Sequence, residues 1–430
     1  MEHDFVMVEK EDGCSRDDPP KYLSEISLLV DSLADPLWSL NTFIHDNPEL
    51  AFEEFKTHDA LVKFMRSQDG WQVTPSACGI KTAWIATFNL GKPGPVVSFN
   101  AEMDALPGLG HACGHNLIAI ASLAAGLTAA CIVKRHGLGG KIVIFGTPGE
   151  EGYRGGKILL LERGAYQDVD ISLISHPGIL HNSPLVRTTA FARLEVEYFG
   201  KAAHAGKSPW EGINALDAVV VAYNAISVLR QQTKPDDVIG LAITDGGKAT
   251  NVIHAYASCV CMIHTGTWSR LEALCEKVSK CFQAGAGATG AKVNITLTEG
   301  YKDHVPNRVL AASYTEYWNQ LPNVPEPQIP PCEQLTHVPS STDQGNLSYA
   351  LPSLNASFAI PPAAPGRQGQ PHSPEFEVAS GTYEAFERAL RVGKALAGTA
   401  IDVLTEPGLL GKIKRQWEQD MAAKAAGASP

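Results

Sequence analysis

The chain has 430 residues, 44% of them hydrophobic and 19% charged, which is enough for roughly two or three domains with large cores. Its formal net charge of -11 leaves no basic stripe for phosphate groups, which argues against nucleic acid as a partner. The polar, acidic residues 1–20 lack the apolar core of a signal peptide, and we expect no run that approaches the length of a membrane span. With nine scattered cysteines, we expect a cytoplasmic protein with reduced thiols, a flexible tail at 1–20 and no membrane partner.

The first half of the chain alternates helical and strand-like segments. Residues 22–69 have a helical pattern, and four strand-like runs follow at residues 79–88, 95–102, 141–149 and 170–175. The last three run into polar residues, namely Asp104, the pair Glu150 and Glu151, and His176. This pattern predicts an α/β fold with a mixed, largely parallel sheet flanked by helices. Because sites in such folds lie beyond the carboxyl ends of the strands, we expect these polar residues to converge.

The pattern changes between residues 187 and 301. Strands and helices there follow the order βαββαβ, which is typical of a ferredoxin-like unit that can fold as an inserted domain. We therefore predict a discontinuous domain of residues 21–186 and 302–430, interrupted by a domain of residues 187–301. Helices near 306–320 and 380–425 and a strand at 353–360 would complete the first domain.

The segment "AEMDALPGLGHACGHN", residues 101–116, contains His111, Cys113 and His115 within five positions. Residues two apart do not share a helix face, so a trio of metal ligands there must come from irregular backbone. The prolines and glycines of the segment supply that irregularity, and Asn116 is the expected N-cap of an apolar helix over 117–133. Taken alone, the segment fits a metal site and a buried cysteine beside two hydrogen-bonded histidines equally well.

Adjacent carboxylates can divide the work of hydrolysis. One member of the pair Glu150 and Glu151 could bind a metal ion while the other takes a proton from the attacking water. Each candidate taken alone has a simpler explanation, because an acidic pair is often a solvated turn. His176 and His372 could equally be histidines held by ordinary hydrogen bonds.

Several motifs occur together in one order between about residues 40 and 400. They are "HDNPELAFEE", "AEMDALPGLGHACGHN", "GTPGEEGYRGGK", "GKAAHAGKSPWEGINALDAV", "ATNVIHAYA", "SSTDQGNLSYALPS" and "HSPEF". With these motifs the chain resembles the dinuclear zinc metallopeptidases and amidohydrolases that include aminoacylases, auxin-conjugate hydrolases and p-aminobenzoyl-glutamate hydrolases. It looks closest to the branch of Xaa-Arg and β-alanyl-lysine dipeptidases. The resemblance implies a zinc-exopeptidase-like catalytic domain with an inserted lid and dimerisation domain, and hydrolysis of an N-acyl amino acid or small dipeptide-like amide.

The same resemblance implies a set of metal ligands and a base. Cys113 would bridge two divalent ions, with Glu151 and His372 completing one site and His115 and His176 the other. Zn²⁺ is the expected metal, with Mn²⁺ or Co²⁺ as alternatives. Glu150 would be the general base, Asp104 would orient His115, and His111 would be structural.

Three residues of the inserted domain carry further expectations from the family. His204, in "GKAAH", would donate a hydrogen bond to the oxyanion in the active site of a dimer partner. Asn251 would lie near the substrate, or else simply form a turn. His264 stands where many relatives have an arginine that grips the substrate carboxylate, so recognition of a free α-carboxylate by this chain is in doubt.

Two alternatives stand beside hydrolysis of an N-acyl amino acid or dipeptide. One is a family member diverted to biosynthetic amide formation or to an unusual amide substrate. The other is a non-catalytic dimeric binding protein, which the complete set of ligands and the presence of a base make less favoured.

Overall fold

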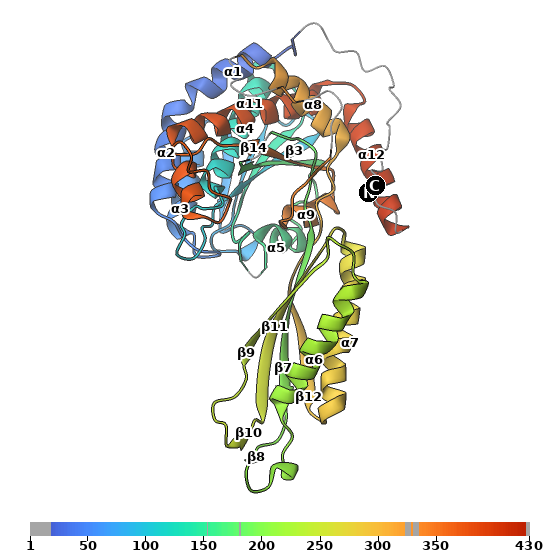
Figure 1. The fold of residues 1–430 in the computed structure, drawn as a ribbon. Helices are drawn as coiled ribbons and strands as arrows, with labels where there is room; N and C mark the ends of the chain where they lie inside the picture. Colours follow the sequence, from blue (N-terminus) through green and yellow to red (C-terminus); the bar gives the residue numbers. More distant parts are fainter. Residues whose placement is uncertain (1–18, 153, 180–181, 323–327, 330–334, 427–430) are drawn as a thin grey trace.

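The computed structural model describes residues 19–152, 154–179, 182–322, 328–329 and 335–426 (Figure 1). Nearly all of the tail expected at residues 1–20 therefore lies outside the described residues. The chain forms an upper body around a six-stranded sheet and an elongated lower body around a four-stranded sheet.

The six-stranded sheet has the order β1-β2-β4-β3-β5-β14. In that order the strands are Trp71–Pro75, Trp84–Asn89, Lys141–Thr147, Val96–Glu102, Ile171–Gly178 and Ser353–Ala359. The pairs among β4, β3, β5 and β14 are parallel, whereas the pairs β1–β2 and β2–β4 are antiparallel. This confirms the predicted mixed, largely parallel sheet, although the edge strand β1 was not predicted.

Helices cover both faces of this sheet. α4 (His115–His136) packs on β3 and against α11 (Tyr383–Thr405), with α1 (Leu23–Ser32) beside them. On the opposite face, α5 (Gly156–Glu162) and α9 (Gln344–Ser348) contact each other and share a hydrophobic cluster with β4. The other helices of this body are α2 (Ala34–Asp46), α3 (Phe55–Arg66), α8 (Arg308–Gln320), α10 (Pro374–Ser380) and α12 (Leu409–Ala425), and two short strands, β6 (Val186–Arg187) and β13 (Thr336–His337), pair beside it.

The start of α4 corrects one expectation. Its N-cap is Gly114, at φ 78°, and not Asn116. The Asn116 Nδ2 group donates instead to Asn41 Oδ1 (3.0 Å) and to the Ser380 carbonyl (2.9 Å), so its side chain joins α4 to α2 and α10.

The composition of α4 corrects a second expectation. The helix is long and apolar enough to cross a membrane, contrary to the expectation that no run reached that length. However, 94% of its most apolar window is buried inside the protein, because α11 and the sheet cover it. Its apolar sequence therefore reflects a central position in the core.

The lower body contains four antiparallel strands in the order β12-β7-β11-β9. Its elements follow each other along the chain as β7 (Ala190–Phe199), α6 (Ala215–Leu229), β9 (Val238–Asp245), β11 (Tyr256–Thr265), α7 (Trp268–Thr289) and β12 (Lys292–Tyr301). This is the βαββαβ order expected from the sequence. A short pair, β8 (Ala203–His204) and β10 (Val252–Ile253), is added at the end far from the upper body (Figure 1).

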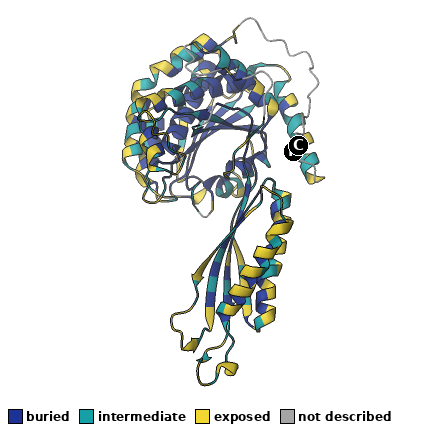
Figure 2. Ribbon diagram, viewed as in Figure 1, coloured by how far each residue is buried: buried dark blue, intermediate teal, exposed yellow. Residues whose placement is uncertain are grey.

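The two helices of the lower body cover only one face of its sheet. Alternate residues of β11, including Cys259, Cys261 and Ile263, join a hydrophobic cluster with α6 and α7. Figure 2 shows that the sides of these helices that face away from the sheet are exposed. Since side chains alternate along a strand, His264 lies on the face of the sheet that carries no helix.

Candidate metal centre

The carboxyl ends of three parallel strands deliver the predicted side chains to one edge of the six-stranded sheet. Asp104 follows β3, the pair Glu150 and Glu151 follows β4, and His176 belongs to the last residues of β5. Further ligand candidates come from the loop before α4 and from the loop before α10. The convergence expected from the strand pattern is therefore present.

Two groups of potential ligands share one sulfur atom. One ligand atom from each of Cys113, His115 and His176 lies within 4.8 Å of the others, and the same is true of Cys113, Glu151 and His372. The Cys113 Sγ atom is 3.4 Å from His176 Nε2, and His372 Nε2 is 3.0 Å from Glu151 Oε1. The shared thiolate, together with imidazoles and a carboxylate, forms a set of donors that suits divalent transition metals.

Asp104 connects two of these ligands. Its Oδ1 atom is 3.0 Å from His115 Nδ1, and its Oδ2 atom accepts a hydrogen bond from the backbone N–H of Glu151 at 2.8 Å. A hydrogen bond from Nδ1 to a carboxylate leaves Nε2 with its lone pair for a metal ion. The buried His115 Nε2 atom has no hydrogen-bond partner in the part of the chain that the structure describes, as expected of a ligand atom.

The backbone around the ligands adopts unusual conformations. Gly114 has φ 78°, and a Cβ atom there would lie 2.5 Å from Pro177 Cγ, so glycine lets the cysteine loop approach the end of β5. His372 has φ 70° without being glycine, and its N–H donates to the Ala112 carbonyl at 2.8 Å. Such a conformation costs free energy and is typical of functional sites, where the surrounding contacts hold it in place.

A buried ionic cluster lies beside Glu150, and the sequence reasoning did not find it. The Lys157 ammonium contacts Glu102 Oε1 at 2.6 Å and also pairs with Asp343. All three residues are at most 1% exposed, and Glu102, Glu150 and Asp343 form another group of close carboxylates. Lys157 supplies the positive charge within that group. The sequence signals for this cluster were Glu102, just before Asp104, and Asp343 in "STDQGN". Nothing in the sequence paired either residue with Lys157.

Burial dominates the protonation of the central groups. It raises the pKa of the Glu150 carboxyl well above its usual range, and the nearby carboxylates of Glu102 and Glu151 raise it further. Burial likewise raises the pKa of the Cys113 thiol well above its usual value, with Glu151 adding to the effect. A bound cation would reverse both shifts, because it stabilises carboxylate and thiolate directly.

His111 is placed close to these ligands but outside both groups. Its ring is 1% exposed and stacks on His45 with 6.3 Å between the ring centroids. Burial lowers the pKa of His111 to about 3, so the ring is neutral at ordinary pH.

The structure does not bring His204 and Asn251 to the metal ligands of the same chain. His204 ends β8 and faces Val252 of β10, and Asn251 immediately precedes β10, so both lie at the far tip of the lower body (Figure 1). Both residues are exposed. His204 Nδ1 accepts the N–H groups of Gly206 and Lys207 at 3.2 and 3.1 Å, which leaves Nε2 to point elsewhere.

His264 lies at the opposite end of the lower body from His204. Its Nδ1 atom is 3.4 Å from Thr189 Oγ1, and its ring packs on Phe191 with 4.9 Å between centroids. Burial lowers the pKa of His264 below its usual value. The ring is therefore a largely neutral hydrogen-bonding group at pH 7.

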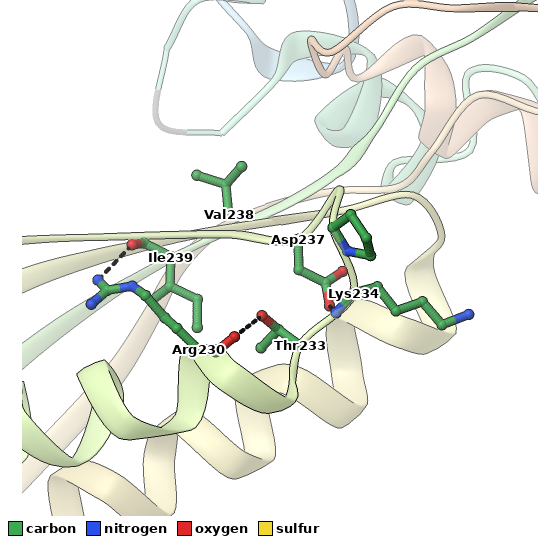
Figure 3. Close-up of a pocket in the computed structure, with 7 residues that line it drawn as sticks. Arg230, Thr233, Lys234, Asp237, Val238 and Ile239 are labelled. Atoms are coloured by element: carbon green, nitrogen blue, oxygen red, sulfur yellow. Dashed lines mark hydrogen bonds between the residues drawn. The ribbon is translucent and has the colours of Figure 1, made fainter. Parts of the chain in front are cut away.

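A surface pocket of about 420 Å³ lies elsewhere, at the turn between α6 and β9 (Figure 3). It is lined by Arg230, Thr233, Lys234, Pro235, Asp237, Val238 and Ile239. Arg230 donates to the Ile239 carbonyl at 2.9 Å, and Thr233 donates to the Arg230 carbonyl at the same distance. None of the predicted site residues lines this pocket, and its Asp237 side chain pairs with Arg270 of α7.

Comparison with known proteins identifies the family of the chain. A profile of peptidase family M20/M25/M40 matches residues 98–397. An Xaa-Arg dipeptidase from Mus musculus is 37% identical over 402 residues, covering 90% of each chain. An Xaa-Arg dipeptidase from Homo sapiens is 36% identical over 423 residues, covering 92% of this chain and 93% of the relative.

Solved structures share the fold at lower identity. A structure from methicillin-resistant Staphylococcus aureus aligns with a TM-score of 0.74 at 21% identity, covering 89% of this chain and all of the other. The Bacillus subtilis YXEP protein, a dinuclear metal-binding peptidase, aligns with a TM-score of 0.62 at 19% identity, covering 87% and 99% of the two chains. The chain therefore belongs to peptidase family M20/M25/M40, a family of amide-bond hydrolases.

Proposed function

We propose that this protein hydrolyses the amide bond of a small dipeptide or N-acyl amino acid at a dinuclear metal centre. The observation that carries the proposal is the pair of ligand groups that meet at Cys113, with Glu150 beside them. The named relatives are dipeptidases, so neither amide formation nor a non-catalytic binding role is favoured.

One metal ion would be held by Cys113, His115 and His176, and the other by Cys113, Glu151 and His372. Zn²⁺ fits this mixture of thiolate, imidazole and carboxylate, and Mn²⁺ or Co²⁺ would also be accepted. The bound ions would polarise the scissile carbonyl and lower the pKa of water. Asp104 fixes the orientation of His115 and the backbone of Glu151 through the two hydrogen bonds described above.

Glu150 would move the proton. Its Oε2 atom is 3.9 Å from His115 Nε2, and the two groups share a cluster with Glu151, so its carboxyl faces the metal ligands. As a carboxylate it takes a proton from the attacking water, and it then delivers this proton to the amide nitrogen as the C–N bond breaks. A positioned base of this kind typically contributes about 10²–10⁴-fold in rate.

Residues 187–301 would act as a lid and as the interface of a homodimer, inserted into a catalytic domain of residues 21–186 and 302–430. His204 and Asn251 lie at the exposed tip of this unit, out of reach of their own metal ligands. A second copy that places its tip over this site would bring His204 Nε2 to the oxyanion and Asn251 to the substrate.

His264 would not anchor a substrate carboxylate strongly. A neutral imidazole packed on Phe191 anchors a carboxylate more weakly than an arginine fork does. The two Xaa-Arg dipeptidases make a dipeptide with a C-terminal arginine a suitable first substrate. The resemblance to p-aminobenzoyl-glutamate hydrolases makes p-aminobenzoyl-glutamate a second.

A reducing compartment such as the cytoplasm fits the thiols. The cysteines in the described part of the chain, Cys78, Cys113, Cys131, Cys259, Cys261, Cys275 and Cys281, are all free. This agrees with a metal site that needs a reduced sulfur.

Replacing Glu150 tests the proposal directly. We expect Glu150→Gln to lower kcat by about 100-fold or more, because the base is lost, while the metal content stays at the wild-type value. Alanyl-arginine, p-aminobenzoyl-glutamate and their C-terminal amides form the assay panel, and elemental analysis measures the metal. Glu162→Gln, at an exposed carboxylate paired with Arg154, is the matched control and should retain full activity. Unchanged turnover of every panel substrate by Glu150→Gln would refute the role of this residue as the base.

Mixing two inactive variants tests the role of a second copy. We expect His204→Ala alone to lose about 100-fold in kcat. Chains with His204→Ala and chains with Glu150→Gln are unfolded and refolded together. If His204 acts across a dimer, about half of the dimers are mixed, and each mixed dimer has one intact site out of two. The sample should therefore recover about one quarter of wild-type activity. No recovery in a sample that contains heterodimers, shown by differently tagged chains, would mean that His204 does not act in the partner's site.

The pH dependence of substrate preference tests His264. Since burial lowers the pKa of His264, its ring is neutral at pH 8, and we expect similar KM values there for alanyl-arginine and its C-terminal amide. As the pH falls below the usual histidine range, the ring becomes charged and the KM of the free acid should decrease relative to the amide. The ratio of the two KM values between pH 5.5 and 8 provides the measurement. Cleavage restricted to the free acid at pH 8 would contradict this account of His264.

A further inference from the structure

The turn that carries Glu150 is held by side chains from three distant parts of the chain. Glu54, at the start of α3, accepts the N–H of Gly149 at 2.8 Å. Asp104 accepts the N–H of Glu151 at 2.8 Å. Tyr301, the last residue of β12, donates its hydroxyl hydrogen toward the carbonyls of Glu150 and Gly152, at 2.8 and 3.1 Å.

Tyr301 belongs to the sheet of the lower body, whereas the turn belongs to the upper body. Its side chain is 5% exposed, so the hydroxyl is shielded from competing water. The hydrogen bond from the Tyr301 hydroxyl to the Glu150 carbonyl therefore connects the lower sheet to the backbone of the proposed base.

Aromatic contacts fix the direction of the Tyr301 ring. Phe191 of β7 lies directly opposite Tyr301 of β12 and opposite His264 of β11. The centroids of Phe191 and Tyr301 are 6.1 Å apart in an edge-on arrangement. Three neighbouring strands therefore support the ring, and such cross-strand aromatic pairs are stabilising.

The junction between the two bodies has a separate set of bonds. Asp303 Oδ1 accepts the N–H of Trp268 at 2.8 Å and the hydroxyl of Tyr349 at 2.6 Å. Its Oδ2 atom pairs with Lys424 of α12. Asp303 thus joins the start of α7 to the upper body through bonds that do not involve the Tyr301 hydroxyl.

We propose that Tyr301 is a positioning residue through which the lower sheet sets the placement of the Glu150 carboxyl for proton transfer. The inference rests on the proposed role of Glu150. Asp104 holds the N–H of Glu151, so removal of the Tyr301 hydroxyl should disturb the Glu150 carbonyl and leave the metal ligand Glu151 in place. A displacement of about 1 Å in a reacting group can cost about 100-fold in rate, so one hydrogen bond at this turn can act strongly on kcat.

The test removes one oxygen atom at a time. Tyr301→Phe deletes the hydroxyl and keeps the ring against Phe191. Tyr198→Phe is the matched control, because the buried Tyr198 hydroxyl also donates to a backbone carbonyl, that of Phe282 at 2.7 Å, but within the lower body. For each variant, we measure kcat and KM on the panel substrate for which the wild type has the highest kcat/KM. We also measure metal content, the thermal midpoint and the hydrogen exchange of residues 149–155.

We expect Tyr301→Phe to lower kcat by about 10- to 100-fold with KM within about twofold of wild type. Its metal content should equal that of wild type, its thermal midpoint should fall no further than that of Tyr198→Phe, and residues 149–155 should exchange faster. Wild-type kcat in Tyr301→Phe would overturn the inference. A variant that loses metal, or that fails to fold, would also overturn it, because the hydroxyl would then serve the structure itself.

Glu150→Gln separates this inference from the proposed function. If Glu150→Gln is inactive while Tyr301→Phe behaves as wild type, only the role of Tyr301 fails. If Glu150→Gln remains active, the proposed base itself is wrong.

Discussion

Buried negative charge is the constraint on which the site depends. Glu102, Asp104, Glu150 and Asp343 are each less than one tenth exposed, and Glu151 and Cys113 lie beside them. Among the described residues of this cluster, Lys157 is the one ammonium group. Lys157 pairs with Glu102 and Asp343 but not with Glu150, and burying Glu150 as a carboxylate is costly, so the cluster favours further positive charge. The two ligand groups that meet at Cys113 are where divalent cations would supply that charge.

The fold concentrates this charge because of its strand directions. Parallel β3, β4 and β5 all end at one edge of the sheet, and glycine at position 114 lets the cysteine loop approach the end of β5. Asp104 then ties His115 and Glu151 together, while Glu54 and Tyr301 fix the turn from other directions. The base and the ligands are thus held by residues that are far apart in sequence, which gives a precise geometry.

Strand patterning predicted much of this arrangement, because each buried strand ends in a polar residue and parallel strands share an edge. The resemblance to a known family then assigned roles to Cys113, His115, Glu151, His176 and His372. The pair of Asp104 and His115 was expected from that resemblance, but the residues that surround Glu150 escaped prediction. Lys157 and Asp343 are 186 residues apart, and Tyr301 reaches Glu150 across 151 residues, so no local pattern reports either contact. Asn116 looked like a helix cap because its tertiary partners on α2 and α10 are invisible in the sequence.

In the lower body, the order of the elements could be predicted, but the surroundings of His204 and Asn251 could not. Its βαββαβ order could be predicted from periodicity, because its core residues alternate regularly along the strands. The position of His204 and Asn251 at its tip depends on the long β strands that carry β8 and β10 away from the sheet of the upper body. What lies against that tip is a property of the assembly and not of one chain.

Metal content tests the central claim most directly. Elemental analysis of protein purified without chelators should find about two equivalents of divalent metal per chain. Because Cys113 belongs to both ligand groups, Cys113→Ser should lose both metals, His372→Ala should lose one, and Cys78→Ser, at an exposed cysteine, should keep both. Removal of the metal by a chelator should lower the thermal midpoint of the wild type. Protein without bound divalent metal, whose thermal midpoint is unaffected by chelators and by added Zn²⁺, Mn²⁺ or Co²⁺, would contradict the account.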